Sequence, residues 1–488
     1  MKLGSWDLIG IAFVLAFGLS LGALWRDRGG HVAEDAALLD PSTEVQIGTE
    51  WMGLYFRGER VGLMRLIKTA RPEGGFDFDL WTTMRLLALH GDATLDVKVQ
   101  AALDARLALE RFSFSVEAGP ATLRGHGTVA GSTVTLAVDT GGQVTERQVE
   151  LARPPVLRVN LGPVLSRQRL EPGARFRYEA FDPLTQAAQP VEVEVLGPET
   201  IEVLHRPVGA TRIRQRMGGL TLDGWINGRG EMLRQELGLG LVAVRETEEE
   251  ARWGVMQARA GRTAADFVEA TMIPAPWLPA TLKGDDAVTL RLSGIDLTRF
   301  ELVDRRQSRD GALLTVRRET VGVGLALPAR GGPPEALLAT PLVQARHPAI
   351  VGAARGAIGD AADTITAALR LMRWVHAHVE QRLVPGVPSA LETLQSGLGD
   401  CNEHSTLFAA LARSVGVPTR IVVGLVYREG RFGYHAWNEV LGEGGWVSVD
   451  ATWNQMPVSV GHVAFLRGGL ARQVEILPVI GNLRIDPP

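Results

Sequence analysis

The one cysteine of the chain, Cys401, lies where a thiol could act as a nucleophile. Asp400 is a favourable N-cap residue, and Glu403 completes a capping-box pattern three positions later, so a helix is predicted to begin at Cys401. The unpaired N–H groups and the positive end of the dipole at a helix start favour an anion and lower the pKa of a thiol. The Asp400 carboxylate opposes this effect, so the thiolate needs a positively charged partner.

His435 is predicted to be that partner, with Asp450 orienting it. His435 lies in a predicted strand over residues 431–440, and Asp450 ends the next predicted strand, over residues 445–450. A two-residue turn at residues 442–443 would bring His435 directly opposite Asp450, with Cβ atoms about 4.5–5.5 Å apart. A longer turn would make the pair diagonal and still within reach. One imidazole nitrogen would then bind the carboxylate while the other faces the cysteine.

A thiolate, an imidazole and a carboxylate can together attack an amide carbonyl, giving a tetrahedral intermediate and then a thioester. Water would complete hydrolysis and an amine would complete transfer, and we expect neither reaction to need a metal or an organic cofactor. The backbone N–H of Cys401 could hold the oxyanion together with a second donor. Trp374 offers an indole N–H for this second role, although its place on a predicted helix favours ordinary packing.

Three separated blocks of the sequence resemble the core of the transglutaminase-like superfamily. They read GDCNEH at 399–404, with LAR at 411–413 and GVPTR at 416–420, then YHAWNEV at 434–440, and finally WVSVDAT at 446–452. The resemblance extends over about residues 365–466. It implies a papain-like α+β core with Cys401 as nucleophile, His435 as base and acid, and Asp450 as the orienting group. Ala451 stands where the family often has proline. Family members include crosslinking enzymes, peptidases and amidases. The resemblance therefore implies the type of chemistry but leaves the substrate open.

Two other interpretations use the same residues differently. His404 follows Cys401 at a Cys-x-x-His spacing, so these two residues could instead bind zinc together with His435 and Asp450, although the ordinary second ligand pair is missing from the sequence. The chain could also be a non-catalytic envelope scaffold or binding protein with a vestigial core. A disabled core, however, has no reason to keep all three catalytic groups.

The composition excludes several other classes of protein. Fifty-one Lys and Arg residues stand against fifty-five Asp and Glu residues, a net charge of -4, so no large basic field exists to bind nucleic acid. A single cysteine permits neither an intrachain disulfide nor a multi-cysteine zinc cluster. With 488 residues, of which 45% are hydrophobic, the chain can bury more than one core.

The hydrophobic periodicity predicts the elements that must position these residues. Apolar residues recur at every second position through most of the first half of the chain, which predicts a large antiparallel β domain over residues 44–270. A proline-bearing stretch at 273–279 is predicted to be a linker, within a small β-rich domain over residues 271–330. From residue 365 the spacing becomes three or four, typical of an amphipathic helix, and the catalytic domain is predicted over residues 331–488.

The N-terminus carries an apolar segment. Residues 8–25 are uncharged, and as a helix they approach the ~30 Å thickness of the hydrocarbon core. Trp6 and Trp25 stand at the two ends, where indoles favour the headgroup zone. Residues 1–28 are therefore predicted to be a transmembrane anchor or an uncleaved signal. A cleaved signal peptide is the alternative, with a weak cleavage site at residues 20–22.

The predicted fold class is multidomain: an N-terminal transmembrane helix, a large antiparallel β domain, a small β-rich domain and a C-terminal α+β transglutaminase-like domain. The predicted function is that of a membrane-anchored cysteine hydrolase that attacks protein or peptide amides, with glutamine γ-glutamyl transfer as the alternative. The expected partners are a protein or peptide substrate in the cell envelope and the membrane, with no nucleic acid. The expected location is the bacterial inner membrane, with the soluble domains periplasmic or extracytoplasmic.

Overall fold

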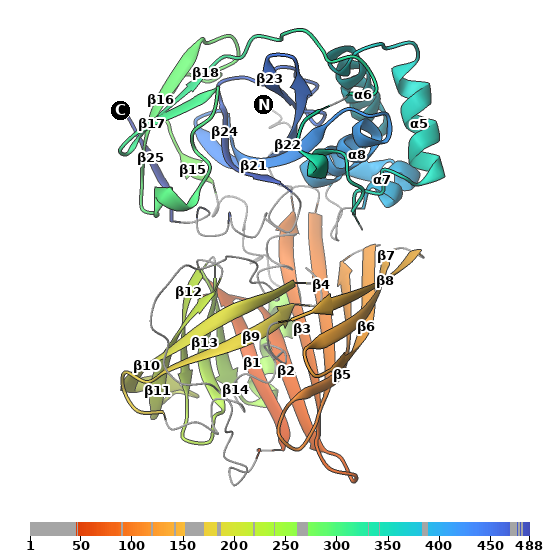
Figure 1. Cartoon of the computed structure of the whole chain (residues 1–488). Coiled ribbons are helices and arrows are strands. Elements are labelled where there is room, and N and C mark those ends of the chain that lie inside the picture. The colour runs from red at the N-terminus through yellow and green to blue at the C-terminus, as the bar shows by residue number, and fades with distance from the viewer. Residues whose placement is uncertain are drawn as a thin grey trace. The chain divides into compact units, whose positions relative to one another are not determined.

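The computed structural model describes residues 45–488, except for 46, 89–90, 119–120, 141–142, 152–169, 183–186, 218–219, 239, 261–271, 330, 341, 383–388, 469–475, 477–478 and 480–481. The chain divides at residues 267–268 into two compact units, each described here by itself. The first unit is built mainly of β-strands, and the second combines β-strands with helices α5 to α8 (Figure 1).

The N-terminal unit is a fourteen-stranded antiparallel sheet (Figure 1). Its strand order is β8-β7-β6-β5-β4-β3-β2-β1-β14-β13-β12-β11-β10-β9, so strands adjacent in the sheet follow one another in the sequence except where β1 pairs with β14. The strands are β1 (Gly48–Phe56), β2 (Glu59–Ala70), β3 (Phe76–Ala88), β4 (Gly91–Leu103), β5 (Leu109–Ala118), β6 (Ala121–Ala130), β7 (Thr133–Thr140), β8 (Gln143–Glu150), β9 (Arg175–Asp182), β10 (Ala187–Val203), β11 (Arg206–Met217), β12 (Leu220–Ile226), β13 (Met232–Gly238) and β14 (Leu241–Glu246).

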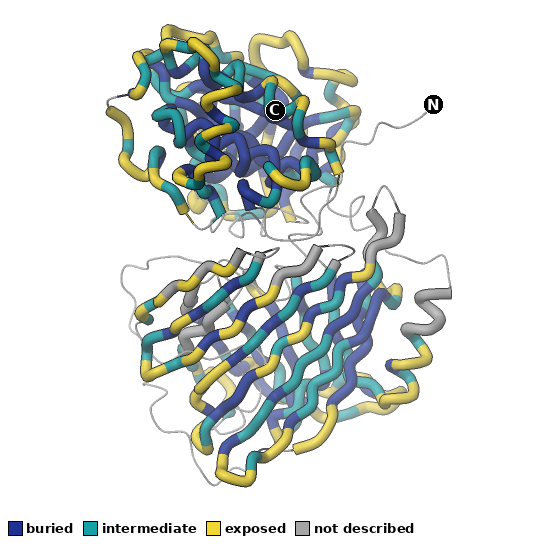
Figure 2. The backbone as a smooth tube through the Cα atoms, turned by 90° about the vertical axis from the view of Figure 1, so that its right-hand side faces the viewer, coloured by how far each residue is buried: buried dark blue, intermediate teal, exposed yellow. Residues whose placement is uncertain are grey.

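The alternating pattern of the sequence explains this sheet. Buried and exposed residues alternate along many of its strands (Figure 2), as expected when one face of a sheet is covered and the other is wet. Helix α3 (Glu248–Ala260) follows the last strand and packs on β1 and β2, where Ala251 is fully buried against Trp51 and Leu63. Three glutamates in the first turn of α3 favour the positive end of its dipole.

The C-terminal unit combines helices with a five-stranded sheet of order β15-β22-β21-β24, in which β23 also pairs with β22. Helices α5, α6 and α8 pack together with strands β22 and β23 in one hydrophobic core, to which Leu371, Leu411 and Val440 contribute. The elements are β15 (Ile273–Pro274), α5 (Pro348–Ile358), α6 (Thr364–His378), α7 (Ala390–Ser396), α8 (Cys401–Ser414), β21 (Thr419–Arg428), β22 (Arg431–Gly442), β23 (Gly445–Val449) and β24 (His462–Gly468).

Two smaller sheets complete this unit. One has the order β17-β18-β16-β25, and the other is the parallel pair β19-β20. Their strands and the two short 3₁₀ helices are β16 (Ala287–Ser293), η2 (Leu297–Arg299), β17 (Gln307–Asp310), β18 (Leu313–Arg317), η3 (Pro334–Ala336), β19 (Glu380–Gln381), β20 (Leu398–Gly399) and β25 (Arg484–Asp486). Strand β25 pairs with β16, so this sheet joins residues 287–293 to residues 484–486.

The proline-bearing stretch at 273–279, predicted to be a linker, is held to the main sheet. Ile273 pairs with Phe432 of β22, and the hydroxyl of Tyr427 donates a hydrogen bond to the carbonyl of Pro279 at 2.6 Å. The prolines interrupt the hydrophobic pattern, and that interruption predicted a linker. The pairing with β22 and the contact with Tyr427 are made with residues far away in the sequence, so the local pattern could not predict them. The domain boundaries predicted at 44, 271 and 331 stay predictions.

The predicted fold class is wrong in its N-terminal element. Among the described residues, which begin at Val45, no helix has the length and apolar character needed to cross a membrane, and the architecture is mostly β. The transmembrane helix predicted over residues 8–25 lies outside the described residues. An apolar run meets the length criterion for a span, but that criterion alone does not establish a helix.

Gly424 of β21 tests the packing that supports the sheet. It pairs with His435 of β22 and lies at a register shift toward β24, and a Cβ there would meet the carbonyl oxygen of Val463 at 2.0 Å. We expect Gly424→Ala to lower the free energy of unfolding by about 2 kcal/mol or more, because the backbone of β24 at Val463 must move away from the new methyl group. Gly352→Ala is the control, since its Cβ would meet nothing within 4 Å in helix α5 and should stabilise the helix slightly. Urea unfolding of both variants measures the difference, and equal stability would contradict the packing described.

Candidate active site

Cys401 is the first residue of helix α8, so the predicted helix start is confirmed. The Asp400 carboxylate accepts a hydrogen bond from the backbone N–H of Asn402 at 2.6 Å, and the Glu403 carboxylate accepts one from the backbone N–H of Asp400 at 2.8 Å. This is the reciprocal capping box. Cys401 is buried, and the backbone N–H of Ala436 in β22 donates to its sulfur. The thiol therefore lies against β22 next to the predicted catalytic histidine.

The electrostatics of the sulfur differ from the prediction. Burial raises the pKa of the Cys401 thiol well above its ordinary value, and the charge of Asp400 raises it further, while the hydrogen bond from Ala436 lowers it only in part. Burial and the neighbouring Glu403 also raise the pKa of Asp400. Desolvation of a charged sulfur thus outweighs the hydrogen bond from Ala436. The sulfur is a neutral thiol until a base removes its proton.

The structure brings His435 and Asp450 together, through a register different from the predicted one. In the ladder of β22 and β23, Gly442 pairs with Gly445, so the two-residue turn falls one residue later than predicted. The pair is consequently diagonal, yet Nε2 of His435 lies 2.9 Å from Oδ2 of Asp450, and both side chains are buried. Because an ionised carboxylate only accepts hydrogen bonds, Nε2 carries the proton and Nδ1 is left for the thiol.

Asp450 accepts four hydrogen bonds, one of them from a residue that the sequence pattern did not single out. Nε2 of His462 lies 3.1 Å from the same Oδ2 that His435 contacts, and the backbone N–H groups of Thr452 and Trp453 donate to Oδ1 at 2.8 and 3.1 Å. Burial by itself raises the pKa of Asp450, but its interactions with His435 and His462, including the hydrogen bonds from their Nε2–H groups, outweigh burial and hold that pKa well below its usual range. Asp450 is therefore an anion at neutral pH.

His462 is the first residue of β24 and is completely buried. Burial lowers its pKa to about 4, so the ring is neutral, and the hydroxyl of Ser459 lies 3.3 Å from Nδ1, where it can donate. The rings of Trp437 and Trp453 meet it edge to face, with centroids 5.3 and 5.5 Å away. Nothing in the local sequence marks this histidine, because β24 reaches the site only through its pairing with β21.

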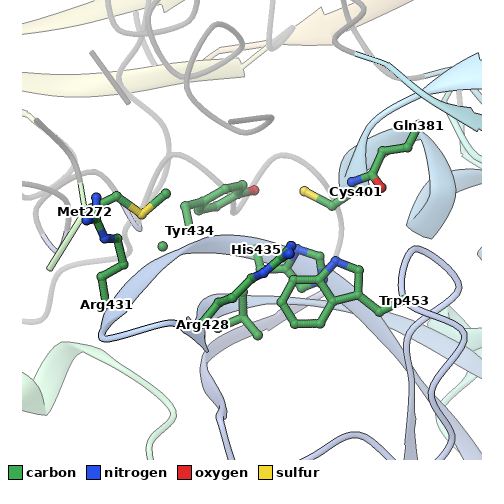
Figure 3. A pocket seen from close by; sticks show the side chains of 10 residues that line it. Met272, Gln381, Cys401, Arg428, Arg431, Tyr434, His435 and Trp453 are labelled. Carbon is green, nitrogen blue, oxygen red and sulfur yellow. The ribbon is translucent and has the colours of Figure 1, made fainter. Parts of the chain in front are cut away.

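Cys401 and His435 line one pocket, and their side chains face the same space (Figure 3). The remaining lining residues are Met272, Gln381, Val426, Arg428, Arg431, Gly433, Tyr434 and Trp453. The space open to a water-sized molecule is about 20 Å³, enough for about one water. Trp453 stacks on His435 with ring centroids 4.9 Å apart. Trp374, the predicted second oxyanion donor, does not line this pocket and stacks on His378 instead.

The side chains of the alternative zinc site do not converge. Nδ1 of His404 lies 2.6 Å from a backbone carbonyl one turn earlier in its own helix. Within the part of the chain that the structure describes, the group of three metal-type side chains whose ligand atoms lie within 4.8 Å of one another is His435, Asp450 and His462. That group contains neither Cys401 nor His404, so the Cys-x-x-His spacing does not become a four-residue site.

Residues 352–451 match the model of the transglutaminase-like superfamily. This segment is a transglutaminase-like domain. It contains Cys401, His435 and Asp450. Among solved structures the chain is similar to a "putative cysteine protease" from Cytophaga hutchinsonii, at 17% identity and a TM-score of 0.28, over 44% of this chain and 80% of that one. It is also similar to a β-barrel-like protein of a domain of unknown function from Brucella abortus, at 10% identity and a TM-score of 0.33, over 41% and 95%. A comparison with curated proteins gives no match.

Asp400→Asn in the transglutaminase-like domain tests the electrostatics of the thiol. Asparagine caps a helix as well as aspartate does, but it removes the charge that raises the pKa of Cys401. Iodoacetamide alkylates the thiolate, so the alkylation rate of Cys401 increases with pH. We expect this increase to occur at a lower pH in Asp400→Asn than in the wild type. Asp363→Asn, the same exchange at the N-cap of α6, is the control and should leave the profile unchanged. An unchanged profile in Asp400→Asn would show that Asp400 does not act on the sulfur.

His462→Gln tests the neutral state of the buried ring. The pKa of His462 is about 4 in the folded protein and about 6.5 in the unfolded chain, so only the unfolded chain takes up this proton as the pH falls from 6.5 to 4. The wild type therefore loses about 3 kcal/mol of stability from this residue across that window. Glutamine can keep both hydrogen bonds without titrating. We expect the stability difference between wild type and His462→Gln to change by that amount over this pH range in urea unfolding; a constant difference would contradict the assignment.

Proposed function

We propose that the transglutaminase-like domain is a cysteine hydrolase of protein or peptide amides, acting through an acyl-thioester on Cys401. The observation that carries the proposal is the buried hydrogen bond of 2.9 Å from His435 to Asp450, in the pocket that Cys401 also lines. This bond fixes the tautomer of His435, with the proton on Nε2 and Nδ1 left unprotonated to act as a base. A thiol, a base and an orienting acid are the three parts that acyl transfer needs.

The raised pKa of Cys401 favours one order of events. The thiol is neutral at rest, so Nδ1 of His435 takes its proton as the sulfur attacks the carbonyl carbon. The S–C bond forms and the carbonyl electron pair moves to the oxygen. When that oxyanion collapses, the C–N bond breaks and His435 returns the proton to the leaving amine. Asp450 stays ionised throughout and stabilises the imidazolium that forms between these steps.

The acyl-thioester is then resolved by a nucleophile. Water activated by His435 gives the carboxylic acid and restores the thiol, and water, unlike an amine donor, is always available. Hydrolysis is therefore the outcome that we propose.

Substitution of each catalytic residue tests the proposal. Cys401→Ala, His435→Ala and Asp450→Ala should each lower turnover by about 10³-fold or more, because the three groups act as a unit. His205→Ala is the matched control, since His205 lies in the N-terminal unit and its side chain is 89% exposed. Circular dichroism and thermal unfolding would show that the variants remain folded.

Mass spectrometry of peptide and protein substrates provides the readout. Peptide-bond cleavage or deamidation of glutamine that depends on Cys401 supports hydrolysis. An isopeptide link that depends on Cys401 would assign the same thioester to transfer instead. Turnover in Cys401→Ala equal to that of the wild type would overturn the proposal.

A further inference from the structure

The amide group of Gln381 is buried in the pocket without a hydrogen-bond partner. Both the nitrogen and the oxygen of this side chain are inaccessible to solvent and unpaired. Gln381 lines the pocket beside Cys401, and its amide end lies next to the cysteine (Figure 3). A buried amide whose N–H donor and carbonyl acceptor are both unpaired costs free energy. This points to a hydrogen-bonding group that arrives with the substrate.

The backbone holds Gln381 in register with Cys401. Strand β19, which contains Gln381, forms a parallel pair with β20, and Gln381 pairs with Gly399. The backbone N–H of Glu380 donates to the carbonyl of Gly397 at 2.7 Å, and that of Arg382 donates to the carbonyl of Gly399 at 3.0 Å. Since Gly399 lies two residues before Cys401, this short sheet couples the position of the amide to the start of helix α8.

The proposed reaction requires a second oxyanion donor at this place. When the sulfur attacks, negative charge develops on the carbonyl oxygen, and the backbone N–H of Cys401 is one donor because the first N–H groups of a helix have no partner within it. We propose that the Nε2–H of Gln381 is the other donor, which makes Gln381 a further catalytic residue. This inference rests on the proposed function. No proton leaves Gln381: its N–H binds the oxyanion as the S–C bond forms and releases it when the C–N bond breaks.

The pocket is also lined by a second side chain with an unpaired donor, Trp453. The indole N–H of Trp453 is also buried and unpaired. Its ring, however, stacks on the imidazole of His435 with an interplanar angle of 29°, on the side of the base. Gln381 instead pairs through its backbone with Gly399, two residues before Cys401, so the strand that carries its amide is paired with the segment that leads into the N–H of Cys401.

Acylation and alkylation of Cys401 together test this role. Acylation by p-nitrophenyl acetate passes through a tetrahedral oxyanion, whereas alkylation by iodoacetamide is a direct displacement that forms no oxyanion at the carbonyl. In Gln381→Leu, which keeps the volume and removes the donor, we expect the acylation rate to fall about 10²- to 10³-fold while the alkylation rate changes less than about threefold. Glu380→Ala, at an exposed position on the same strand, is the control.

Each other outcome overturns the assignment. Equal losses in both reactions would make Gln381 a residue that orders the thiol, and no loss of acylation would exclude it as the donor. Should Gln381→Leu fail to fold, Gln381→Ala repeats the measurement with a smaller side chain. A wild-type protein acylated no faster than Cys401→Ala would instead count against the proposed function, so the two failures are distinguishable.

Discussion

The hydrogen bonds to the buried carboxylate of Asp450 are the interaction on which the geometry of the site depends. Its four donors come from three parts of the chain: His435 from β22, His462 from β24, and the backbone of Thr452 and Trp453 in the turn that follows Asp450 itself. An anion at this depth is stable only while its hydrogen bonds are made, and the loss of one leaves a charge partly unpaired in a medium of low dielectric. The two strands and the turn are therefore held in one arrangement, and the orientation of the imidazole follows from it.

The same burial has the opposite effect on the sulfur. Water is excluded from both groups, but Asp450 has two histidines to offset the cost of its charge, whereas Cys401 faces the acids Asp400 and Glu403. The charge of the resting site is thus concentrated on the carboxylate, and the thiol keeps its proton. His435 is bonded to the carboxylate and lines the same pocket as the thiol. Because the thiol is neutral at rest, the two carboxyl groups of the capping box do not stand beside a charged sulfur. They can therefore cap the helix that begins with the nucleophile.

Helix α8 sets the position of the sulfur because it is buried along almost its whole length, from Cys401 to Arg413. Its polar side chains are paired inside the domain: the hydroxyl of Ser405 donates to the carbonyl of Asn402, and the carbonyl of Ser405 accepts from Asn438 of β22. A central helix fixed by such contacts cannot slide along the sheet without breaking them. The N-terminal unit has a simpler basis, since the alternation of its strands is enough to build a long antiparallel sheet.

Local patterns by themselves determined the start of helix α8 at Cys401, the strand that carries His435, the strand that ends just before Asp450, and the resemblance to the transglutaminase-like superfamily, because capping and alternation involve residues close together in the chain. The turn between β22 and β23 was misplaced by one residue, since several glycines there permit either register. The tertiary structure alone decided the position of His462, the unpaired amide of Gln381 and the raised pKa of the thiol. Each of these depends on strand pairing between distant segments, or on how completely water is removed from a side chain, and neither can be read from neighbouring residues.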